Sequence, residues 1–446
     1  MSALMQTIHE GFKQTEVGII PDDWNSASLH EICSFGGGTT PPRSQHDRYF
    51  VGGNNNWIKT TDLNNSLLEI SEEQITDLAI AETGLKKHPV GSVLVAMYGG
   101  FNQIGRTGYI TQPSSINQAL VAVKPKPKKL HSYYLLSELN YNVDYWKGVA
   151  SSSRKDPNIT SNDVKNYKIA LPSVEEQTAI ANALSDVDTL LTELEKLIAK
   201  KQAIKTATMQ QLLTGKTRLP QFSTYTDGAA EGKSKRTKPS ELGEIPEDWN
   251  VITIGESCDV LTGFPFPSNK YSDSGIRLLR GSNVKRGETD WSSNITQYWP
   301  NMSSNIKEYE LHEGDIVVSM DGSLVGRSYA QLSKSDLPAI LLQRVARIRS
   351  EAIELNYLKE WVCSKFFTLH CDSVKTVTAI PHISPLDIRS FKLLVPSEPK
   401  EQTAIATILS DMDNEIQTLE QRLTKTRQIK QGMMQQLLTG RTRLPY

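Results

Sequence analysis

The feature that most constrains this 446-residue sequence is an internal duplication. Three pairs of segments match at one offset of about 225 residues: 15–25 (TEVGIIPDDWN) with 240–250 (SELGEIPEDWN), 176–181 (EQTAIA) with 401–406, and 209–215 (MQQLLTG) with 434–440. Cys33 and Cys258 match at the same offset. A repeat of this length predicts two copies of one fold.

The two copies are similar to different degrees along their length. Segments 174–220 and 399–445 are identical at more than half of their positions. Segments 26–166 and 251–390 share only scattered landmarks, such as 91–97 (GSVLVAM) with 314–320 (GDIVVSM). A constant part suits a common scaffold or partner, whereas a divergent part on the same fold suits the reading of two different targets.

The size and composition narrow the class of protein. A chain of 446 residues has room for two to four domains. It has no apolar run long enough to span a bilayer, and residues 1–11 lack the pattern of a secretory signal, so we expect a cytoplasmic protein without membrane contact. The four cysteines lack metal-ligand spacing, which predicts reduced, buried thiols and no metal.

The constant part predicts a long helix over residues 174–213, where the sequence has no glycine or proline. Such a helix is about 60 Å long. Ser173 is suited to the N-cap, and Glu175 and Glu176 favour the first turn because of the helix dipole. Gly215 stands where a left-handed C-cap is expected.

Apolar residues in both constant segments alternate by three and four, which is the pattern of a coiled-coil seam. The residues expected in this partner-binding seam are Ile180, Leu184, Val187, Leu191, Leu194 and Ile198 in the first copy, and Ile405, Leu409, Met412, Ile416, Leu419 and Leu423 in the second. We expect the two helices to pair with each other in antiparallel fashion. The alternative is that each helix packs on its own domain as an ordinary core helix.

The divergent parts predict mixed α and β structure. In the first copy, residues 90–97 form a buried strand with neighbours at 109–111 and 119–123. Residues 130–149 predict one helix, and 169–171 predict a closing strand. In the second copy, 316–320, 345–348, 357–367 and 393–395 match in order. Glycine-rich loops are expected at Gly36 to Gly38, Gly52 to Gly53, Gly99 to Gly100 and Gly263.

Polar and cationic side chains in these divergent parts are of the kinds that bind DNA. Arginine binds guanine through two hydrogen bonds, asparagine does the same with adenine, and lysine mainly neutralises phosphate. The alternative for each residue is a solvated loop position. The candidates are Thr39, Thr40, Arg43, Lys59, Thr60, Asn102, Arg106, Arg154 and Lys155 in the first copy, and Thr262, Arg280, Ser282, Asn283, Lys285, Arg286, Arg327 and Lys375 in the second.

The sequence lacks the patterns of the catalytic sites considered. It has no methyltransferase Asn-Pro-Pro-Tyr motif, no nuclease carboxylate set and no nucleophile elbow. Gly215-Lys216-Thr217 lacks the upstream glycine of a phosphate-binding loop, since Gln210 stands there. We therefore expect a chain that is not an enzyme.

The order of the repeated motifs resembles the specificity subunit of Type I restriction–modification systems. The resemblance rests on residues 18–24, on Pro172-Ser173 followed by EQTAIA at 176–181, and on QQLLTG at 210–215, with their second copies. It covers nearly the whole chain. One departure is residues 263–266 (GFPF), which stand where the first copy has 38–41 (GTTP).

The resemblance implies an α+β fold with two mixed target recognition domains, separated by two long antiparallel coiled-coil helices in a pseudo-twofold internal repeat. The expected boundaries are an N-terminal arm at 1–14, the first domain at 15–172, a spacer helix at 173–218, a linker at 219–239, the second domain at 240–397 and a C-terminal spacer helix at 398–446.

The resemblance also implies partners. Each domain would read half of a bipartite site in double-stranded DNA, with two methyltransferase subunits docked on the helices and restriction subunits joining them. S-adenosylmethionine and ATP–Mg would be bound by those partners and not by this chain. The formal net charge of −1 argues mildly against DNA contact by the chain alone. The alternative function is a structural adaptor whose duplicated domains bind proteins or glycans.

If the helices set the spacer between two half-sites, four extra residues within 190–197 should lengthen the spacer. They add about 6 Å and turn the helix about 40° beyond a full turn. Since each base pair rises by about 3.4 Å, we expect one or two more base pairs between unchanged half-sites, measured by sequencing the methylated motif. Changed half-sites with a constant spacer would refute this.

Overall fold

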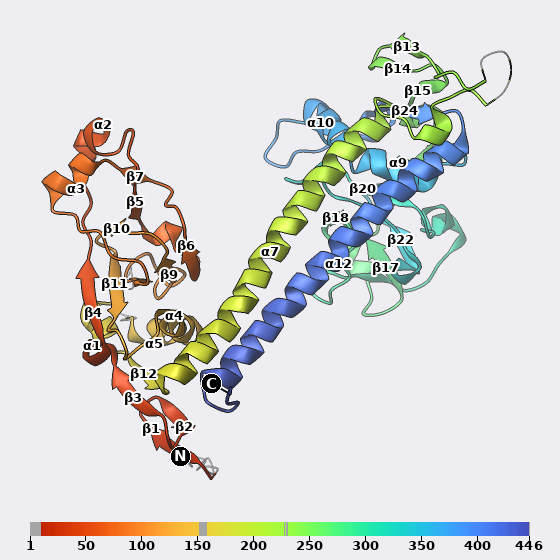
Figure 1. Cartoon of the computed structure of the whole chain (residues 1–446). Helices are drawn as coiled ribbons and strands as arrows, with labels where there is room; N and C mark the ends of the chain where they lie inside the picture. Colours follow the sequence, from red (N-terminus) through yellow and green to blue (C-terminus); the bar gives the residue numbers. More distant parts are fainter. Residues whose placement is uncertain (1–9, 151–157, 227, 229–230, 446) are drawn as a thin grey trace. The chain divides into compact units, whose positions relative to one another are not determined.

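The chain forms two compact units. The computed structural model describes residues 10–150, 158–226, 228 and 231–445. Unit 1 comprises the chain up to residue 196 together with residues from 421 onward, and unit 2 comprises residues 197–420. The two long helices, α7 (Val174–Leu213) and α12 (Pro399–Leu437), therefore each contribute one half to each unit (Figure 1).

Unit 1 is built on a five-stranded sheet of order β4-β11-β8-β9-β6 and a three-stranded sheet of order β10-β5-β7. A pair of strands, β3 and β12, and a hairpin, β1 and β2, complete it. The strands are β1 (Phe12–Thr15), β2 (Gly18–Pro21), β3 (Asn25–Ser28), β4 (Cys33–Gly37), β5 (Asn55–Ile58), β6 (Ser66–Leu68), β7 (Gln74–Ile75), β8 (Val93–Ala96), β9 (Thr107–Ile110), β10 (Ser115–Ile116), β11 (Leu120–Pro125) and β12 (Lys168–Leu171).

Short helices connect and cover these strands. They are α1 (Leu29–Ile32), η1 (Arg43–Gln45), α2 (His46–Tyr49), η2 (Thr60–Asp62), α3 (Asp77–Thr83), α4 (Ser132–Tyr141), α5 (Tyr145–Val149) and α6 (Ser161–Asn166). The core of the unit gathers the apolar sides of β8, β11 and α4 around the fully buried Trp24, and Ile180 and Leu184 of α7 join it.

Unit 2 repeats this topology with a largely different sequence. Its five-stranded sheet has the order β16-β23-β20-β21-β18, and its three-stranded sheet has the order β19-β17-β22. The strands are β13 (Thr237–Ser240), β14 (Gly243–Pro246), β15 (Trp249–Thr253), β16 (Asp259–Thr262), β17 (Ile276–Leu279), β18 (Arg286–Gly287), β19 (Tyr298–Trp299), β20 (Ile316–Ser319), β21 (Tyr329–Gln331), β22 (Ala339–Leu341), β23 (Val345–Arg349) and β24 (Lys392–Pro396).

The helices of unit 2 follow the same plan. They are η3 (Pro220–Phe222), α8 (Ile254–Ser257), η5 (Ser268–Lys270), η6 (Gly281–Asn283), η7 (Ser304–Tyr309), η8 (Lys334–Asp336), α9 (Leu355–Val362), α10 (Lys365–Val374) and α11 (Pro385–Arg389). Parts of the predicted linker form specific contacts. The backbone carbonyl of Tyr225 accepts the N–H of Gly232, and the side chain of Lys235 pairs with Asp248 at 2.9 Å.

The central strands lie where the sequence predicts them. β8 is fully buried and pairs in antiparallel fashion with both β9 and β11, which are its predicted neighbours. Its counterpart β20 pairs in the same way with β21 and β23. The shared landmark of the two copies is therefore the middle of each five-stranded sheet.

Three expectations about local structure are wrong. The predicted single helix over 130–149 is split into α4 and α5, and Asn142 ends α4 by donating its side-chain N–H to the carbonyl of Glu138. In the second copy, the segment 357–367 is split between α9 and α10. Gly36 and Gly37 lie in strand β4 and not in a loop. Gly36 stands there because its Cα passes the ring of His88, where a Cβ would come within 2.3 Å of the ring.

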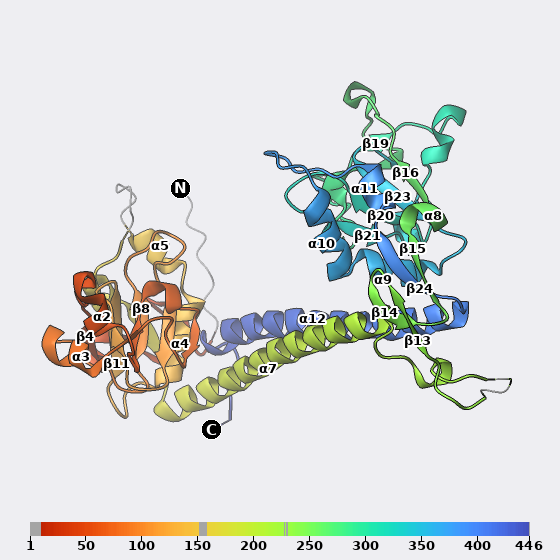
Figure 2. The same cartoon turned by 90° about the horizontal axis from the view of Figure 1, so that it is seen from above.

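The two long helices run antiparallel within each unit (Figures 1 and 2). In unit 1, Lys430 pairs with Asp188 and Arg427 pairs with Glu195. In unit 2, Lys201 pairs with Glu415 at 2.7 Å and Lys205 pairs with Asp413 at 2.5 Å. Along these pairs the residue numbers rise in α7 and fall in α12, so the two helices run in opposite directions.

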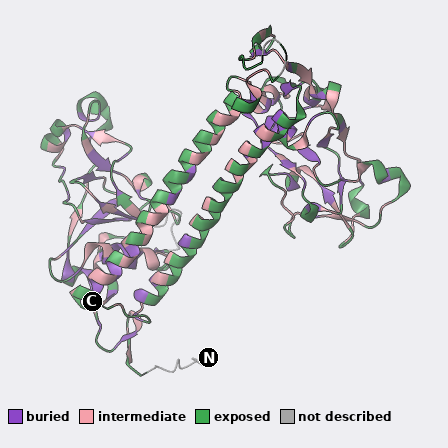
Figure 3. Ribbon diagram, turned by 45° about the vertical axis from the view of Figure 1, so that its right-hand side comes forward, coloured by how far each residue is buried: buried purple, intermediate pink, exposed green. Residues whose placement is uncertain are grey.

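The predicted seam residues all lie on the covered side of the helices. Ile180, Leu184, Leu194, Ile198, Ile405, Leu409 and Ile416 are buried, and Val187, Leu191, Met412, Leu419 and Leu423 are half-buried. Much of the remaining helix surface is exposed (Figure 3). The first turns of each helix also pack on the domain that precedes it. Each helix therefore both pairs with the other helix and packs as a core helix on its own domain.

The ends of α7 are capped as predicted. The Ser173 hydroxyl accepts the N–H of Glu176 at 3.2 Å, and Gly215 adopts the left-handed conformation with φ +67°. Gly440 has the same φ after α12. These glycines turn the chain so that an arginine three residues later reaches back to a domain.

In unit 2 this arginine is Arg218. We call the hydrogen-bonded set of Arg218, Glu401, Asp248 and Trp249 the clasp of this unit. Arg218 donates to Glu401 at the start of α12 at 2.7 and 2.9 Å and to Asp248 at 2.8 Å. Glu401 is almost fully buried and also accepts the indole N–H of Trp249 at 3.2 Å. Unit 1 repeats the clasp with Arg443, Glu176, Asp23 and Trp24.

We expect Glu401→Gln to lower the stability of unit 2 by about 3 kcal/mol, because it removes one partner of a buried ion pair. The change is measured as a loss of Tm in calorimetry. Arg427→Ala is the control: Arg427 and Glu195 have side chains 58% and 52% exposed, so its loss should cost less than about 1 kcal/mol. Equal effects of the two variants would contradict the structural role of the clasp.

Candidate nucleic-acid interface

Equivalent turns in the two units present a cation at the end of a buried strand. Lys59 follows β5 and Arg280 follows β17, each just before a short 3₁₀ helix. The turns are fixed alike: the N–H of Lys59 donates to Asp62 at 2.7 Å, and that of Arg280 donates to Asn283 at 3.1 Å. Because each turn directly follows a strand and is closed by its own hydrogen bond, the point at which the cationic side chain leaves the domain is fixed.

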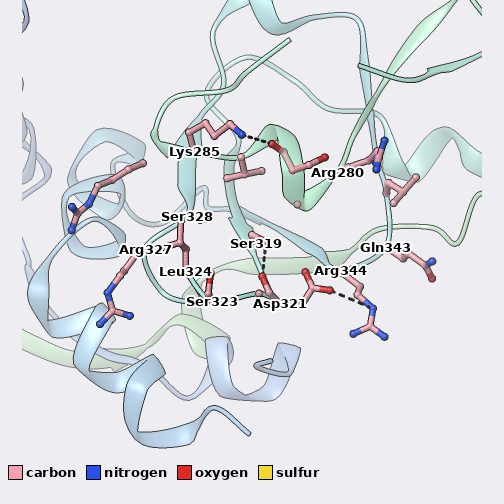
Figure 4. Close-up of a pocket in the computed structure, with 16 residues that line it drawn as sticks. Arg280, Lys285, Ser319, Asp321, Ser323, Leu324, Arg327, Ser328, Gln343 and Arg344 are labelled. Atoms are coloured by element: carbon pink, nitrogen blue, oxygen red, sulfur yellow. Dashed lines mark hydrogen bonds and ion pairs between the residues drawn. The ribbon is translucent and has the colours of Figure 1, made fainter. Parts of the chain in front are cut away.

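In unit 2 this turn borders an open hollow of about 700 Å³ (Figure 4). Its wall is formed by η6, β18, the β20–β21 connection and the β22–β23 turn. Five of the eight residues predicted for this copy line it: Arg280, Ser282, Lys285, Arg286 and Arg327. The fold therefore brings together residues that are up to 47 positions apart in the chain.

Cationic side chains outnumber carboxylates along the wall of the hollow. The hollow is lined by five cationic side chains, those of Arg280, Lys285, Arg286, Arg327 and Arg344, and by one carboxylate, that of Asp321. Lys285 donates to the carbonyl of Ser282 at 2.8 Å and lies 3.6 Å from Asp290. An excess of positive charge over a concave surface attracts polyanions.

Arg327 is held by a carboxylate beside the hollow. It donates to both oxygens of Asp372, at 2.7 and 3.2 Å, and Lys375 donates to the same group at 2.6 Å. Hydrogen bonds from Arg327 and Lys375 lower the pKa of Asp372 to about 2. Both cations are thus partly neutralised, and Lys375 does not line the hollow.

Asn283 and Thr262, which were also predicted to bind DNA, do not line the hollow. The side chain of Asn283 is fully buried, where it accepts the N–H of Arg280 and donates to the carbonyl of Asp290 at 2.8 Å. It holds the turn and faces no solvent. Thr262 is half-buried on β16 and is not part of the hollow.

Several residues that line the hollow were not predicted from the sequence, above all Gln343, Arg344, Asp321 and Leu324. Leu324 is 59% exposed. One signal pointed to this turn: at the repeat offset, Gln343 corresponds to Gln118, so both copies have glutamine just before a predicted strand.

In unit 1, the structure gathers Thr39, Thr40, Arg43, Lys59 and Thr60. Arg43 and Lys59 both pair with Glu73, at 2.7 and 3.4 Å. The Arg43 guanidinium also lies over the Phe50 ring at 4.4 Å. Burial alone would lower the pKa of Lys59, but Glu72 and Glu73 raise it above its ordinary value, so the side chain is cationic.

The smaller members of this group are tied to neighbouring segments. The N–H of Thr39 donates to the carbonyl of Ile116 at 3.1 Å, and its own carbonyl accepts the indole N–H of Trp57 at 3.0 Å. The Thr40 hydroxyl donates to Gln118. Thr60 is half-buried at the start of η2.

The β8–β9 connection carries the remaining described candidates of unit 1. Asn102 is exposed, and Arg106 follows Gly105, which has φ +78°. Arg327 follows Gly326 in the same conformation, with φ +77°. Arg106 pairs with no carboxylate among the residues that the structure describes, unlike Arg327. Arg154 and Lys155 lie outside the described residues.

A second hollow in unit 1 has a volume of about 490 Å³ and was not foreseen. Lys86, Lys87 and Lys124 line it beside the glycines of β4. His88 also lines it, and its Nε2 donates to the carbonyl of Gly37 at 3.2 Å. Burial lowers the pKa of His88, so the lysines supply the positive charge.

Two glycines at equivalent positions keep these turns in place. A Cβ on Gly38 would come within 2.0 Å of the carbonyl oxygen of Ile116, and a Cβ on Gly263 within 2.2 Å of the backbone of Leu342. Segments 38–41 (GTTP) and 263–266 (GFPF) therefore begin with the same close backbone contact and differ after it. In the second copy, Phe264 and Phe266 form an aromatic cluster with Tyr309 and Trp299.

Among the described residues, no group of three or more histidine, cysteine, aspartate or glutamate side chains is arranged to hold a metal, and no helix is long and apolar enough to cross a membrane. Cys33 and Cys371 are buried as expected, whereas Cys258 and Cys363 are half-buried. Burial raises the pKa of the Cys33 thiol to about 12, which keeps it protonated.

Comparison with known proteins agrees with this architecture. A family model described as the Type I restriction modification DNA specificity domain matches residues 21–206 and again residues 246–430. The chain is 28% identical over 340 residues to the Type I restriction enzyme MjaVIII specificity subunit of Methanocaldococcus jannaschii, covering 75% of this chain and 76% of that protein.

Two further relatives extend the match over nearly the full length. A putative Type I restriction enzyme MjaX specificity subunit of the same organism is 24% identical over 445 residues, covering 98% of this chain and 97% of that protein. The crystal structure of a Type I restriction–modification S subunit from M. genitalium superposes with a TM-score of 0.59 at 13% identity, covering 93% and 96% of the two chains. The fold is therefore shared.

We expect Gly38→Ala to destabilise unit 1 by about 2 kcal/mol or more, because the added methyl group overlaps a backbone carbonyl that cannot move without breaking the sheet. Gly37→Ala is the matched control, since a Cβ at Gly37 meets nothing within 4 Å. Thermal unfolding of both variants measures the difference. Equal loss of Tm would show that the close approach is unimportant.

Proposed function

Because this chain belongs to the Type I restriction modification DNA specificity family, we propose that its two domains read the two halves of a bipartite site in double-stranded DNA. The turns after β5 and β8 would face DNA in the first domain, and the turns after β17, β20 and β22 in the second. The chain supplies recognition, and the chemistry belongs to its partners.

The observation that carries this proposal is a constant framework with different side chains at its rim. Both domains have the same strand order and the same turns. At equivalent positions after the central strand, the first domain has Tyr98, and the second has Asp321. A scaffold that is kept while its rim changes is what two readers of unlike sequences require.

The charges at the rim suit two kinds of contact. Arg286 and Lys285 are exposed and lie on the wall of the hollow, where they can neutralise phosphates. Phosphate contacts position a protein on DNA without reading its sequence. Arg280, which is half-buried at the end of β17, and Gln343, which is exposed on the β22–β23 turn, are suited to base edges in the major groove.

The near-neutral total charge fits a protein that does not hold DNA alone. In this proposal, two methyltransferase subunits dock on the exposed faces of α7 and α12, and restriction subunits join the assembly. S-adenosylmethionine and ATP–Mg belong to those partners. The helix pair sets the length of the DNA spacer that is not read.

The proposal is tested by footprinting DNA with the chain in complex with its methyltransferase partner. We expect two protected blocks separated by an unprotected gap. The double variant Arg280→Ala/Arg286→Ala should weaken one block only and reduce the salt dependence of binding, because two cations are lost from one reader. Lys334→Ala is the control, since Lys334 is exposed on η8 but does not line the hollow.

A single continuous block in the footprint would refute the two-reader proposal. Retention of the complex on DNA irrespective of sequence would do the same. If the complex did not bind DNA at all, the adaptor function considered from the sequence would take its place.

A further inference from the structure

The turn between β22 and β23 holds an arginine in a backbone conformation that arginine seldom adopts. Arg344 has φ +67° and is one of three non-glycine residues with positive φ among those described. Such conformations persist only where the surrounding structure fixes them, and they concentrate at functional sites.

The backbone around Arg344 is fixed at three points. Its carbonyl accepts the N–H of Met320 at 2.9 Å, the N–H of Gln343 donates to Phe264 at 3.0 Å, and that of Leu342 donates to Leu279 at 3.1 Å. The turn is therefore anchored to strands on both sides. A side chain that leaves such a turn has a defined starting position.

The side chain of Arg344 lines the hollow and is 63% exposed. Its Nε lies 3.6 Å from the Oδ2 of Asp321, as the dashed line in Figure 4 marks. The two Nη nitrogens contact no acceptor among the described residues. A guanidinium oriented through Nε presents its Nη edge as a fork of donors, which matches the O6 and N7 acceptors of guanine.

Asp321 is itself held in place. Its backbone forms an isolated antiparallel β-bridge with the backbone of His382. The N–H of the next residue, Gly322, donates to the carbonyl of Pro381 at 3.0 Å. The Asp321 side chain is 27% exposed, against 63% for Arg344. The carboxylate is thus the more buried member of the pair, on a backbone that is held in place, and the arginine is the more exposed member.

The first domain is an internal control for this pair. Its equivalent turn makes the same backbone hydrogen bond, from the N–H of Met97 to the carbonyl of Ala119 at 2.9 Å, but Ala119 does not have the positive φ of Arg344. There Ala119 replaces Arg344, and Tyr98 replaces Asp321. Both members of the pair and the left-handed backbone are missing together, although the hydrogen bond to the central strand remains.

We propose that Arg344, positioned by Asp321, reads a guanine in the half-site of the second domain, and that the first domain reads no guanine through the equivalent turn. This inference rests on the proposed function and specifies one base contact of it. Arg344 is the base-reading residue, and Asp321 is a positioning residue that acts through it.

The test is to sequence the methylated motif in cells that carry the complete system with altered Arg344. Arg344→Gly keeps the left-handed backbone free of strain and removes the fork, whereas Arg344→Lys keeps the charge and removes the paired donors. We expect both variants to lower the preference for guanine at one position of one half-site by roughly 5- to 140-fold, which corresponds to the discrimination of one bidentate contact.

Asp321→Asn should relax the same position by a smaller factor, because the arginine remains while its orientation is lost. Arg286→Ala is the matched control, since loss of a phosphate contact weakens methylation evenly at all positions. Uniform loss of methylation in the Arg344 variants, or an unchanged preference at every guanine, would overturn the inference.

The wild-type motif separates this inference from the proposed function. If wild-type methylation shows no bipartite motif, the proposed function itself fails. If it shows a bipartite motif without guanine in either half-site, the two-domain reading stands, and the assignment of Arg344 fails.

Discussion

The fold of each unit depends on a buried carboxylate at the start of a long helix. Glu401 accepts Trp249 from its own domain and Arg218 from the chain that follows the other helix, and Glu176 does the same with Trp24 and Arg443. A carboxylate buried without partners would be costly. Each clasp therefore requires the end of one long helix to lie beside the start of the other, which makes antiparallel pairing the arrangement that satisfies both.

With the helices and strands fixed in this way, the rims of the domains are free to differ. Gly38 and Gly263 preserve one close backbone contact, while the residues after them diverge into a threonine-rich turn and an aromatic cluster. Arg106 and Arg327 follow equivalent left-handed glycines, yet only Arg327 pairs with a carboxylate among the described residues. The two domains thus differ at these positions while their sheets keep the same strand order.

The sequence predicted the long helices, their caps and the central strands because these depend on local periodicity and on residues near in the chain. It placed five of the residues that line the unit 2 hollow. It did not predict the break between α4 and α5, which arises from a hydrogen bond of Asn142. It also treated Asn283 as a reader, because burial of a polar side chain inside a turn leaves no signal in residue type.

The sequence by itself determined that this protein is a duplicated fold with a constant helical part and two divergent domains, because repetition and helical periodicity are properties of residue order. Only the tertiary structure decided which cations stay free and which are neutralised. Arg344 and Asp321 are 23 residues apart in the chain, and the pairing of β20 with β23 brings them to one edge. Partners of this kind are set by strand register in space, which residue types alone do not specify.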